Sequence, residues 1–145
     1  MATLALLGKY FITVGIQGSK RFQAGSRPPE DTSMAVKSRA NRQTFGREPP
    51  PSEGAGEADV RWQRIVQNDL ENLPLGLIVA WGSLFSCYSP RAHSFLVGLF
   101  CASRIGHTYC YAHAMQPHRS VMYVLGMMST VGMGLNGLLG LYKKK

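Results

Sequence analysis

Three groups of polar residues lie within or beside the long apolar segments of this 145-residue chain. The first group has a helical spacing of three, four and three residues, so its members share one face of a helix. The second and third groups lie in the two apolar segments that follow. Together the groups bring guanidinium, imidazole, phenol, amide, hydroxyl and carboxylate functions: Arg61, Arg64, Asn68, Glu71, Arg104, His107, Tyr111, Arg119, Ser120 and Tyr123.

Such a set is suited to holding a small zwitterion that has extra carboxylates and one further group kept as an anion. Glu71 can accept from an ammonium group, and arginines can donate to carboxylates in bidentate fashion. The sequence offers no Ser/His/Asp triad and no phosphate-binding loop. His107, His113 and His118 are too scattered to predict a metal site.

Simpler interpretations of the same residues stay open. The first group fits a solvated amphipathic turn beside a membrane. Tyr111 and Tyr123 fit aromatic residues at a membrane interface, and His107 fits a hydrogen bond to a neighbouring backbone. Arg104 and Arg119 resist such explanations, because a buried guanidinium without an anion is costly.

The distribution of charge argues against an ordinary soluble domain. All 8 acidic residues lie at or before Glu71, although the net charge is +8. A soluble domain mixes both signs over its surface. The basic residues lie in a linker or at helix ends, which speaks against a nucleic-acid-binding face. The three cysteines lie in apolar segments without metal spacing, so they do not predict a disulfide framework.

The apolar runs predict an all-α chain with four transmembrane helices, at about 2–19, 60–88, 92–115 and 118–142. Positive charge follows the first run, whereas a signal peptide would have it before the run. Lys9 is expected to snorkel or to face a partner helix, and Pro74 to kink the second helix. Gly126, Thr130 and Gly134 form a stripe of small residues suited to close helix packing.

The segment at about 22–59 is rich in proline, glycine and charge, and predicts a flexible loop. Most of the lysines and arginines cluster on the side of the membrane where this loop lies. The positive-inside rule therefore predicts that the loop is cytosolic.

Three motifs carry a resemblance to a known family. They read Asn68-Asp69-Leu70-Glu71-Asn72, Arg104-Ile105-Gly106-His107-Thr108 with Tyr111, and Pro117-His118-Arg119-Ser120 with Tyr123. The chain resembles the superfamily of membrane-associated proteins in eicosanoid and glutathione metabolism (MAPEG). The branch it resembles holds microsomal glutathione transferase and microsomal prostaglandin E synthase, whose Pro-Glu-Asp motif is similar to Pro29-Glu30-Asp31.

The resemblance implies a single MAPEG-like domain over 1–145, folded as an integral membrane four-helix bundle that assembles as a homotrimer. It implies that glutathione binds between subunits near the cytosolic side. The implied catalytic residues are Arg119, which would stabilise the glutathione thiolate, with Ser120 and Asp31 as assistants. The implied glutathione-binding residues are Arg64, Asn68, Glu71, Arg104, His107, Tyr111, Arg119, Ser120 and Tyr123.

The implied activity is conjugation of glutathione to lipophilic electrophiles, or reduction of lipid hydroperoxides, in the endoplasmic reticulum or the mitochondrial outer membrane. The partners would be glutathione, a lipophilic substrate and the bilayer, without nucleic acid. Two alternatives within the fold stay open: isomerisation of a prostaglandin endoperoxide, and a non-catalytic lipid-binding or scaffold role. A small transporter is a third, although no inverted repeat supports it.

Overall fold

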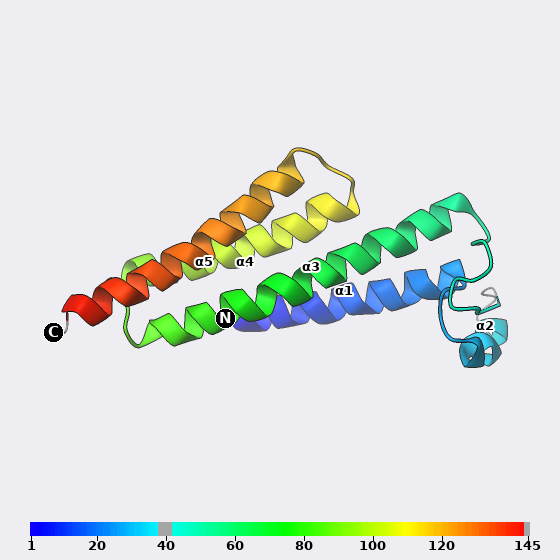
Figure 1. Ribbon diagram of the computed structural model, residues 1–145, viewed down its shortest axis with the longest axis horizontal. Helices are drawn as coiled ribbons and strands as arrows, with labels where there is room; N and C mark the ends of the chain where they lie inside the picture. The colour runs from blue at the N-terminus through cyan, green and yellow to red at the C-terminus, as the bar shows by residue number, and fades with distance from the viewer. Residues whose placement is uncertain (38–41, 144–145) are drawn as a thin grey trace. The chain divides into compact units, whose positions relative to one another are not determined.

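The computed structural model describes residues 1–37 and 42–143, and every regular element in them is helical. Figure 1 shows their order along the chain. The elements are α1 (Ala2–Ala24), the short 3₁₀ helix η1 (Pro29–Asp31), α2 (Thr32–Lys37), α3 (Glu53–Leu84), α4 (Pro90–Ala112) and α5 (His118–Lys143). The predicted all-α class is confirmed. The short helix α2 was not predicted.

The first helix extends further than the sequence predicted and ends at Ala24 instead of residue 19. Gly25 follows it with φ +74°, a conformation that favours glycine. The Gly25 N–H donates to Phe22 O at 3.3 Å, and the Ser26 N–H donates to Arg21 O at 3.0 Å. This pair of bonds satisfies the last carbonyls of the helix and fixes its end.

The third helix begins at Glu53, seven residues before the predicted start at Val60. The Ser52 hydroxyl accepts from the Ala55 N–H at 3.3 Å, which is an N-cap contact. The negative charge of Glu53 in the first turn is stabilised by the positive end of the helix dipole. The prediction was wrong because the glycines here were taken as loop residues, whereas the cap and the acidic turn favour a helix.

The turn between α3 and α4 lies earlier than predicted. The helix α3 ends at Leu84 instead of residue 88, and α4 begins at Pro90 instead of residue 92. Ser89 caps α4 by accepting from the Ala92 N–H at 3.4 Å, and Pro90 occupies the first helical position. Asn136 of α5 accepts from the Ser89 N–H and donates to the Ser89 carbonyl, both at 3.1 Å. These bonds hold the turn against α5.

At its other end α4 stops at Ala112, three residues before the predicted end at Met115. Ala114 has φ +56°, which is incompatible with a continuing right-handed helix. The helix α5 begins at the predicted residue, His118, and ends at Lys143, one residue after the predicted end.

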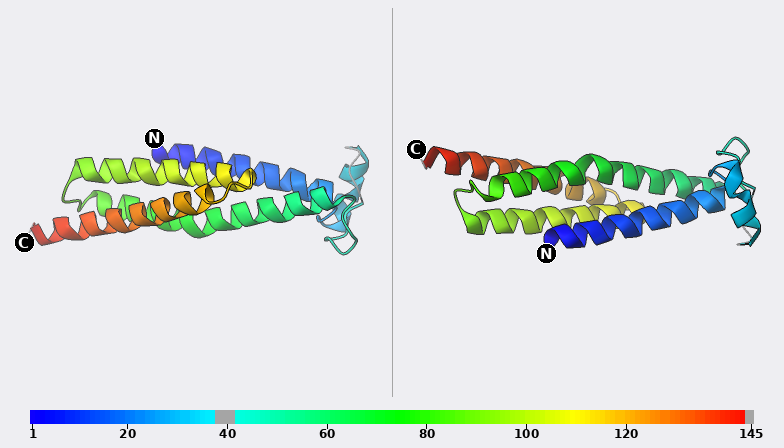
Figure 2. Two further views of the ribbon diagram at one scale, coloured as in Figure 1. Left: turned by 90° about the horizontal axis from the view of Figure 1, so that it is seen from above. Right: turned by 90° about the horizontal axis from the view of Figure 1, so that it is seen from below.

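The chain divides into two compact units. The bundle unit consists of Met1–Lys9 and Asn68–Lys145, and the loop unit consists of Tyr10–Gln67. The bundle unit therefore contains the first turns of α1, the second half of α3, and all of α4 and α5. In Figure 2, α4 and α5 lie side by side, and the chain runs along them in opposite directions. The two helices are in contact.

Glycines bring the helices of the bundle unit close together. A Cβ atom at Gly76 of α3 would lie 2.1 Å from Phe100 Cζ of α4. One at Gly106 of α4 would lie 2.9 Å from Met122 Sδ of α5. Real Cβ atoms do not approach other atoms so closely, so these contacts depend on glycine.

The predicted packing stripe of Gly126, Thr130 and Gly134 is confirmed at Gly126, where a Cβ atom would lie 3.1 Å from Ser103 Oγ of α4. Further along α5 the structure corrects it. A Cβ atom at Gly134 would meet only Val79, at an ordinary 3.7 Å. The tight approaches are at Gly137, 2.6 Å from Ser83 Cβ, and at Gly140, 1.7 Å from the Ser86 carbonyl oxygen. The stripe was predicted at regular intervals of four, whereas the buried face of α5 drifts because a turn takes 3.6 residues.

The helix α5 has its polar and small residues inside and its large apolar residues outside. The buried residues are Gly126, Ser129, Met133, Asn136, Gly137 and Gly140. The exposed ones include Val121, Val124, Met127, Met128, Val131, Leu135, Leu138, Leu139 and Leu141. This is the reverse of a helix on a soluble protein, and it fits a helix surrounded by lipid.

Among the described helices, α5 alone is long and apolar enough to cross a membrane by length and composition. Membrane crossing by α1, α3 and α4 stays a prediction.

The loop unit is ordered by polar contacts where the sequence predicted a flexible loop. Gln43 is 1% exposed, and its amide donates to Phe22 O at 3.0 Å and accepts from the Arg27 N–H at 3.1 Å. The Ser26 hydroxyl donates to the Asp59 carboxylate. Composition did not reveal these contacts because they need no apolar residues. Residues 38–41 of the predicted loop lie outside the described residues, and its flexibility and cytosolic location stay predictions.

Candidate functional site

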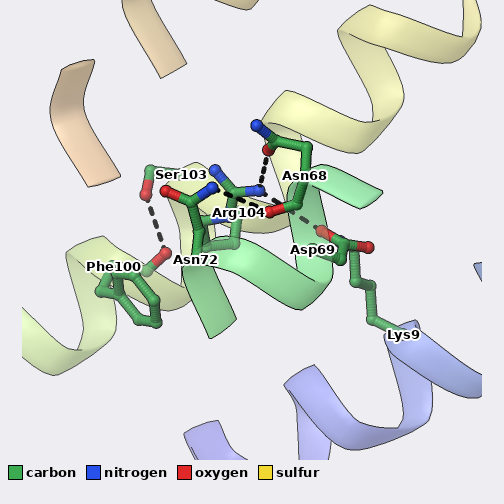
Figure 3. Close-up of polar contacts among 7 residues, drawn as sticks. All are labelled: Lys9, Asn68, Asp69, Asn72, Phe100, Ser103 and Arg104. Atoms are coloured by element: carbon green, nitrogen blue, oxygen red, sulfur yellow. Dashed lines mark hydrogen bonds and ion pairs between the residues drawn. The ribbon is translucent and has the colours of Figure 1, made fainter. Parts of the chain in front are cut away.

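A charged cluster lies inside the bundle unit where α1, α3 and α4 meet (Figure 3). We define it as Lys9, Asn68, Asp69 and Arg104. Arg104 Nη2 donates to Asp69 Oδ1 at 3.3 Å and also to Asn68 Oδ1, and Lys9 Nζ donates to Asp69 Oδ1. Arg104 is 1% exposed and Asp69 is 0% exposed. One carboxylate thus links three helices.

The charged cluster holds two cations and one anion, and its hydrogen bonding is incomplete. Within the described residues, Arg104 Nε and Nη1 and Asp69 Oδ2 are buried without a hydrogen-bond partner. The neighbouring polar side chains are turned to their own helices. Asn72 donates to Asn68 O, and Ser103 donates to Phe100 O, both at 2.8 Å. The cluster therefore has an excess positive charge and donors left over.

Arg104 and Asn68 are site residues that the sequence predicted, whereas Asp69 and Lys9 were not predicted to belong to the site. A signal for Asp69 was present. A buried guanidinium needs an anion, and Asp69 and Glu71 are the only carboxylates after Val60. Asp69 lies four residues before Leu73 and seven before Gly76, on the buried face of α3. Of the two interpretations of Lys9, the structure favours contact with a partner helix.

A second group of site residues lies at the turn between α4 and α5. We call His107, Tyr111, Arg119 and Tyr123 the arginine–aromatic cluster. The Arg119 Cζ atom lies 4.4 Å from the centre of the Tyr111 ring. The His107 ring centre lies 5.8 Å from that of Tyr111 and 6.1 Å from that of Tyr123. At 4.4 Å the face of the Tyr111 ring attracts the Arg119 guanidinium cation.

Helix geometry explains why these four residues meet. His107 and Tyr111 are four residues apart and so share one face of α4, and Arg119 and Tyr123 do the same on α5. The turn at 113–117 is short, so the two helices pack as antiparallel neighbours and face each other. His107 is buried, at 4% exposed, whereas Arg119 is half-buried. The arginine–aromatic cluster therefore extends from the buried His107 to the partly exposed Arg119.

Ser120 and Arg119 are connected through Gln116. In the amide orientation that satisfies both neighbours, Gln116 accepts from Arg119 Nε at 3.0 Å and donates to Ser120 Oγ at 3.1 Å. The Ser120 side chain is exposed. The pair predicted to form the catalytic centre is thus held together beside the arginine–aromatic cluster.

The remaining predicted site residues are Glu71, Arg64 and Asp31. Glu71 is exposed on α3, one turn after Asn68. Arg64 is exposed on the part of α3 that belongs to the loop unit. Asp31, also in the loop unit, accepts from Arg27 Nε at 2.7 Å. The predicted roles of these three residues stay predictions.

Comparison with known families supports the interpretation of these motifs. A family model described as the MAPEG family matches residues 1–139. The chain belongs to the MAPEG family. A comparison with curated protein sequences found no match. MAPEG proteins are membrane-associated, and the family name refers to eicosanoid and glutathione metabolism. The exposed large apolar side chains of α5 agree with the membrane association of MAPEG proteins.

Proposed function

We propose that this MAPEG protein is an integral membrane enzyme that uses glutathione, either to conjugate lipophilic electrophiles or to reduce lipid hydroperoxides. The observation that carries the proposal is the arginine–aromatic cluster with Ser120 beside it. It places a half-buried cation, Arg119, beside the rings of Tyr111, His107 and Tyr123 at one end of the helix pair α4 and α5. A cation so placed attracts an anion, and a thiolate is the anion that glutathione chemistry needs.

The residues of the bundle unit fit glutathione in charge and in donor chemistry. The tripeptide has carboxylates, one ammonium group and one thiol. Arg119 can hold the thiolate, and the exposed Ser120 hydroxyl can donate to it. Glu71 can accept from the ammonium group. The unpaired Nε and Nη1 donors of Arg104 fit a carboxylate, although Arg104 already donates to Asn68 and Asp69.

Glutathione, when bound, supplies the thiol that acts as nucleophile or reductant. The chain's contribution is to keep that thiol deprotonated. A free cysteine-type thiol has a pKa of about 8.5, and a guanidinium beside it lowers that pKa. Arg119 lies over the Tyr111 ring and also donates to the Gln116 amide oxygen. Two such contacts limit the positions of the guanidinium and so orient the cation.

The first test is glutathione binding to the purified full chain in a mild detergent, followed by assays with an aryl halide electrophile and a lipid hydroperoxide. In the first assay, a carbon–sulfur bond forms and halide leaves. In the second, two glutathione molecules become a disulfide while the hydroperoxide becomes an alcohol and water. We expect micromolar to millimolar binding and turnover in at least one assay. Binding without turnover on either would favour the scaffold role, and absence of binding would refute the proposal.

A further inference from the structure

A groove of about 480 Å³ lies in the bundle unit near the turn between α3 and α4. Its walls come from the start of α1, the last turns of α3 and the first half of α4. They are mostly apolar, with Leu6, Leu77, Ala80, Val97 and Phe100 among them. No carboxylate, guanidinium or lysine side chain lines it, and its one charged lining group is the amino terminus of Met1, a fully exposed residue. The volume is in the range of small-molecule sites.

One buried polar side chain in this wall has no hydrogen-bond partner among the described residues. His93 is 4% exposed, and its Nδ1 atom is unpaired. Two other polar groups in the wall pair with each other, since Trp81 Nε1 donates to the Thr3 hydroxyl at 3.2 Å. Leaving a buried polar atom unpaired is unfavourable. A ligand that pairs with His93 would remove that cost.

The chemistry of the walls restricts the ligand. Apolar walls favour a hydrocarbon chain. An ionised head group beside the buried His93 would find no counter-charge on any lining side chain, which is unfavourable, so a neutral head group is favoured there. A neutral imidazole has one donor and one acceptor nitrogen, and a hydroxyl group can pair with either.

We propose that this groove binds a neutral lipid with one alkyl chain and a hydroxyl head group, and that the hydroxyl pairs with His93. The site is separate from the one proposed for glutathione. His93 and His107 are 14 residues apart on α4, which corresponds to about 21 Å along the helix. The proposal therefore does not depend on the glutathione-dependent activity.

The test uses the full chain in phosphatidylcholine nanodiscs and a photoreactive probe, hexadecanol with a diazirine in its alkyl chain. After irradiation, the labelled peptides are identified by mass spectrometry. We expect saturable labelling within residues 77–84 or 93–100. Unlabelled hexadecanol should compete at least tenfold better than hexadecane, which has the chain without the hydroxyl. Labelling that does not saturate would overturn the proposal, because it would reflect contact with bulk lipid only.

Two glycines provide a matched pair of variants. Gly98 lines the groove, and a Cβ atom there meets nothing within 4 Å, so Gly98→Leu should fill the groove without a clash. Gly82 is exposed, equally unobstructed and not part of the groove. We expect at least a tenfold loss of saturable labelling in Gly98→Leu and no change in Gly82→Leu. Equal labelling in both variants would contradict the proposal.

The role of His93 is tested separately with His93→Leu. This variant should bind hexadecanol and hexadecane equally, because the hydroxyl has lost its partner. A variant that still prefers hexadecanol would refute the pairing with His93. Cross-links between two protein chains at the groove, replacing the lipid label, would show that a second copy occupies it and would also refute the proposal. Helical content and elution from size exclusion show whether each variant is folded.

Discussion

The Arg104 guanidinium and the Asp69 carboxylate form an ion pair at 3.3 Å in which neither side chain is more than 1% exposed. The pair connects α4 to α3, and Lys9 extends it to α1. In a low-dielectric interior a charge is tolerated only with a partner of opposite sign. Asp69 is that partner for both cations, so removing this carboxylate would leave both of them buried without an anion.

Asp69→Asn is expected to destabilise the protein strongly. The substitution leaves two buried cations without an anion, and breaking a buried pair in this way costs about 3–5 kcal/mol. Lys9→Met should cost much less, because the Arg104–Asp69 pair remains. Unfolding in mild detergent, followed by circular dichroism, measures the free energy of each variant.

The double variant Lys9→Met/Asp69→Asn sharpens this prediction. It removes one of the two buried cations that Asp69→Asn leaves without an anion. The decrease in its free energy of unfolding should therefore be smaller than the sum of the two single decreases, by about 0.5–3 kcal/mol. Glu71→Gln is the control, since it removes an exposed carboxylate two residues away on the same helix. If Glu71→Gln were as destabilising as Asp69→Asn, the ion pair would not be the cause.

Gly76→Ala should destabilise the contact between α3 and α4. The new Cβ atom would lie 2.1 Å from Phe100 Cζ, and Phe100 is 2% exposed, so its ring has little space to move. Overpacking of this kind costs about 1–3 kcal/mol.

The matched control for this substitution is Gly82→Ala. Its Cβ atom meets nothing, and alanine in a helix is favoured over glycine by about 1 kcal/mol. Gly82→Ala should therefore be neutral or stabilising in the same unfolding experiment. Adding Phe100→Leu to Gly76→Ala should recover part of the loss. If both alanine substitutions changed the free energy of unfolding equally, helix propensity would explain the changes and the contact with Phe100 would not.

The protein is expected to form an oligomer in mild detergent, most simply a trimer. Large apolar side chains on the outer face of α5, such as Val131 and Leu135, are exposed, and helices of neighbouring chains can cover such a face together with lipid. Light scattering of the protein–detergent complex, corrected for bound detergent, gives the number of chains. A stable monomer with full glutathione-dependent turnover would contradict this prediction.

The sequence predicted the four long helices because apolar runs of about 20 residues are distinctive. It was less successful at helix ends, where single contacts decide. The start of α3 depends on a hydroxyl cap at Ser52, and the end of α1 depends on the positive φ of Gly25. Neither changes the apolar pattern, so composition and hydropathy did not reveal them.

The site was predictable to the extent that helix spacing and the length of a turn determine it. The spacing of four from His107 to Tyr111, and again from Arg119 to Tyr123, was visible, and the short turn brings the two pairs together. The partner of Arg104 was missed, because charge on the polar face of α3 was considered and charge on its buried face was not. Counting the carboxylates available to a buried arginine would have found Asp69.

Arg119→Leu should lower turnover far more than glutathione affinity. The variant keeps the apolar part of the side chain, but it removes the cation that lies over the Tyr111 ring. The other proposed contacts to glutathione remain, so KM should change only modestly. Without the cation, the thiol pKa rises toward its free value of about 8.5, and only a few per cent is thiolate at pH 7. Turnover at pH 7 should fall at least tenfold, which corresponds to about 1.4 kcal/mol.

The pH dependence separates this explanation from a loss of structure. If Arg119 stabilises the thiolate, the bound thiol of the unsubstituted protein is already deprotonated near neutral pH, so raising the pH should add little turnover. In Arg119→Leu the thiolate fraction increases as the pH rises through about 8.5, so the gap between the two proteins should narrow. Arg91→Leu is the control, because Arg91 is exposed in the first turn of α4, far along that helix from His107. Arg119→Lys should restore part of the turnover, since it keeps a cation. If the deficit of Arg119→Leu stayed constant from pH 7 to pH 9, Arg119 would position the peptide without stabilising the thiolate.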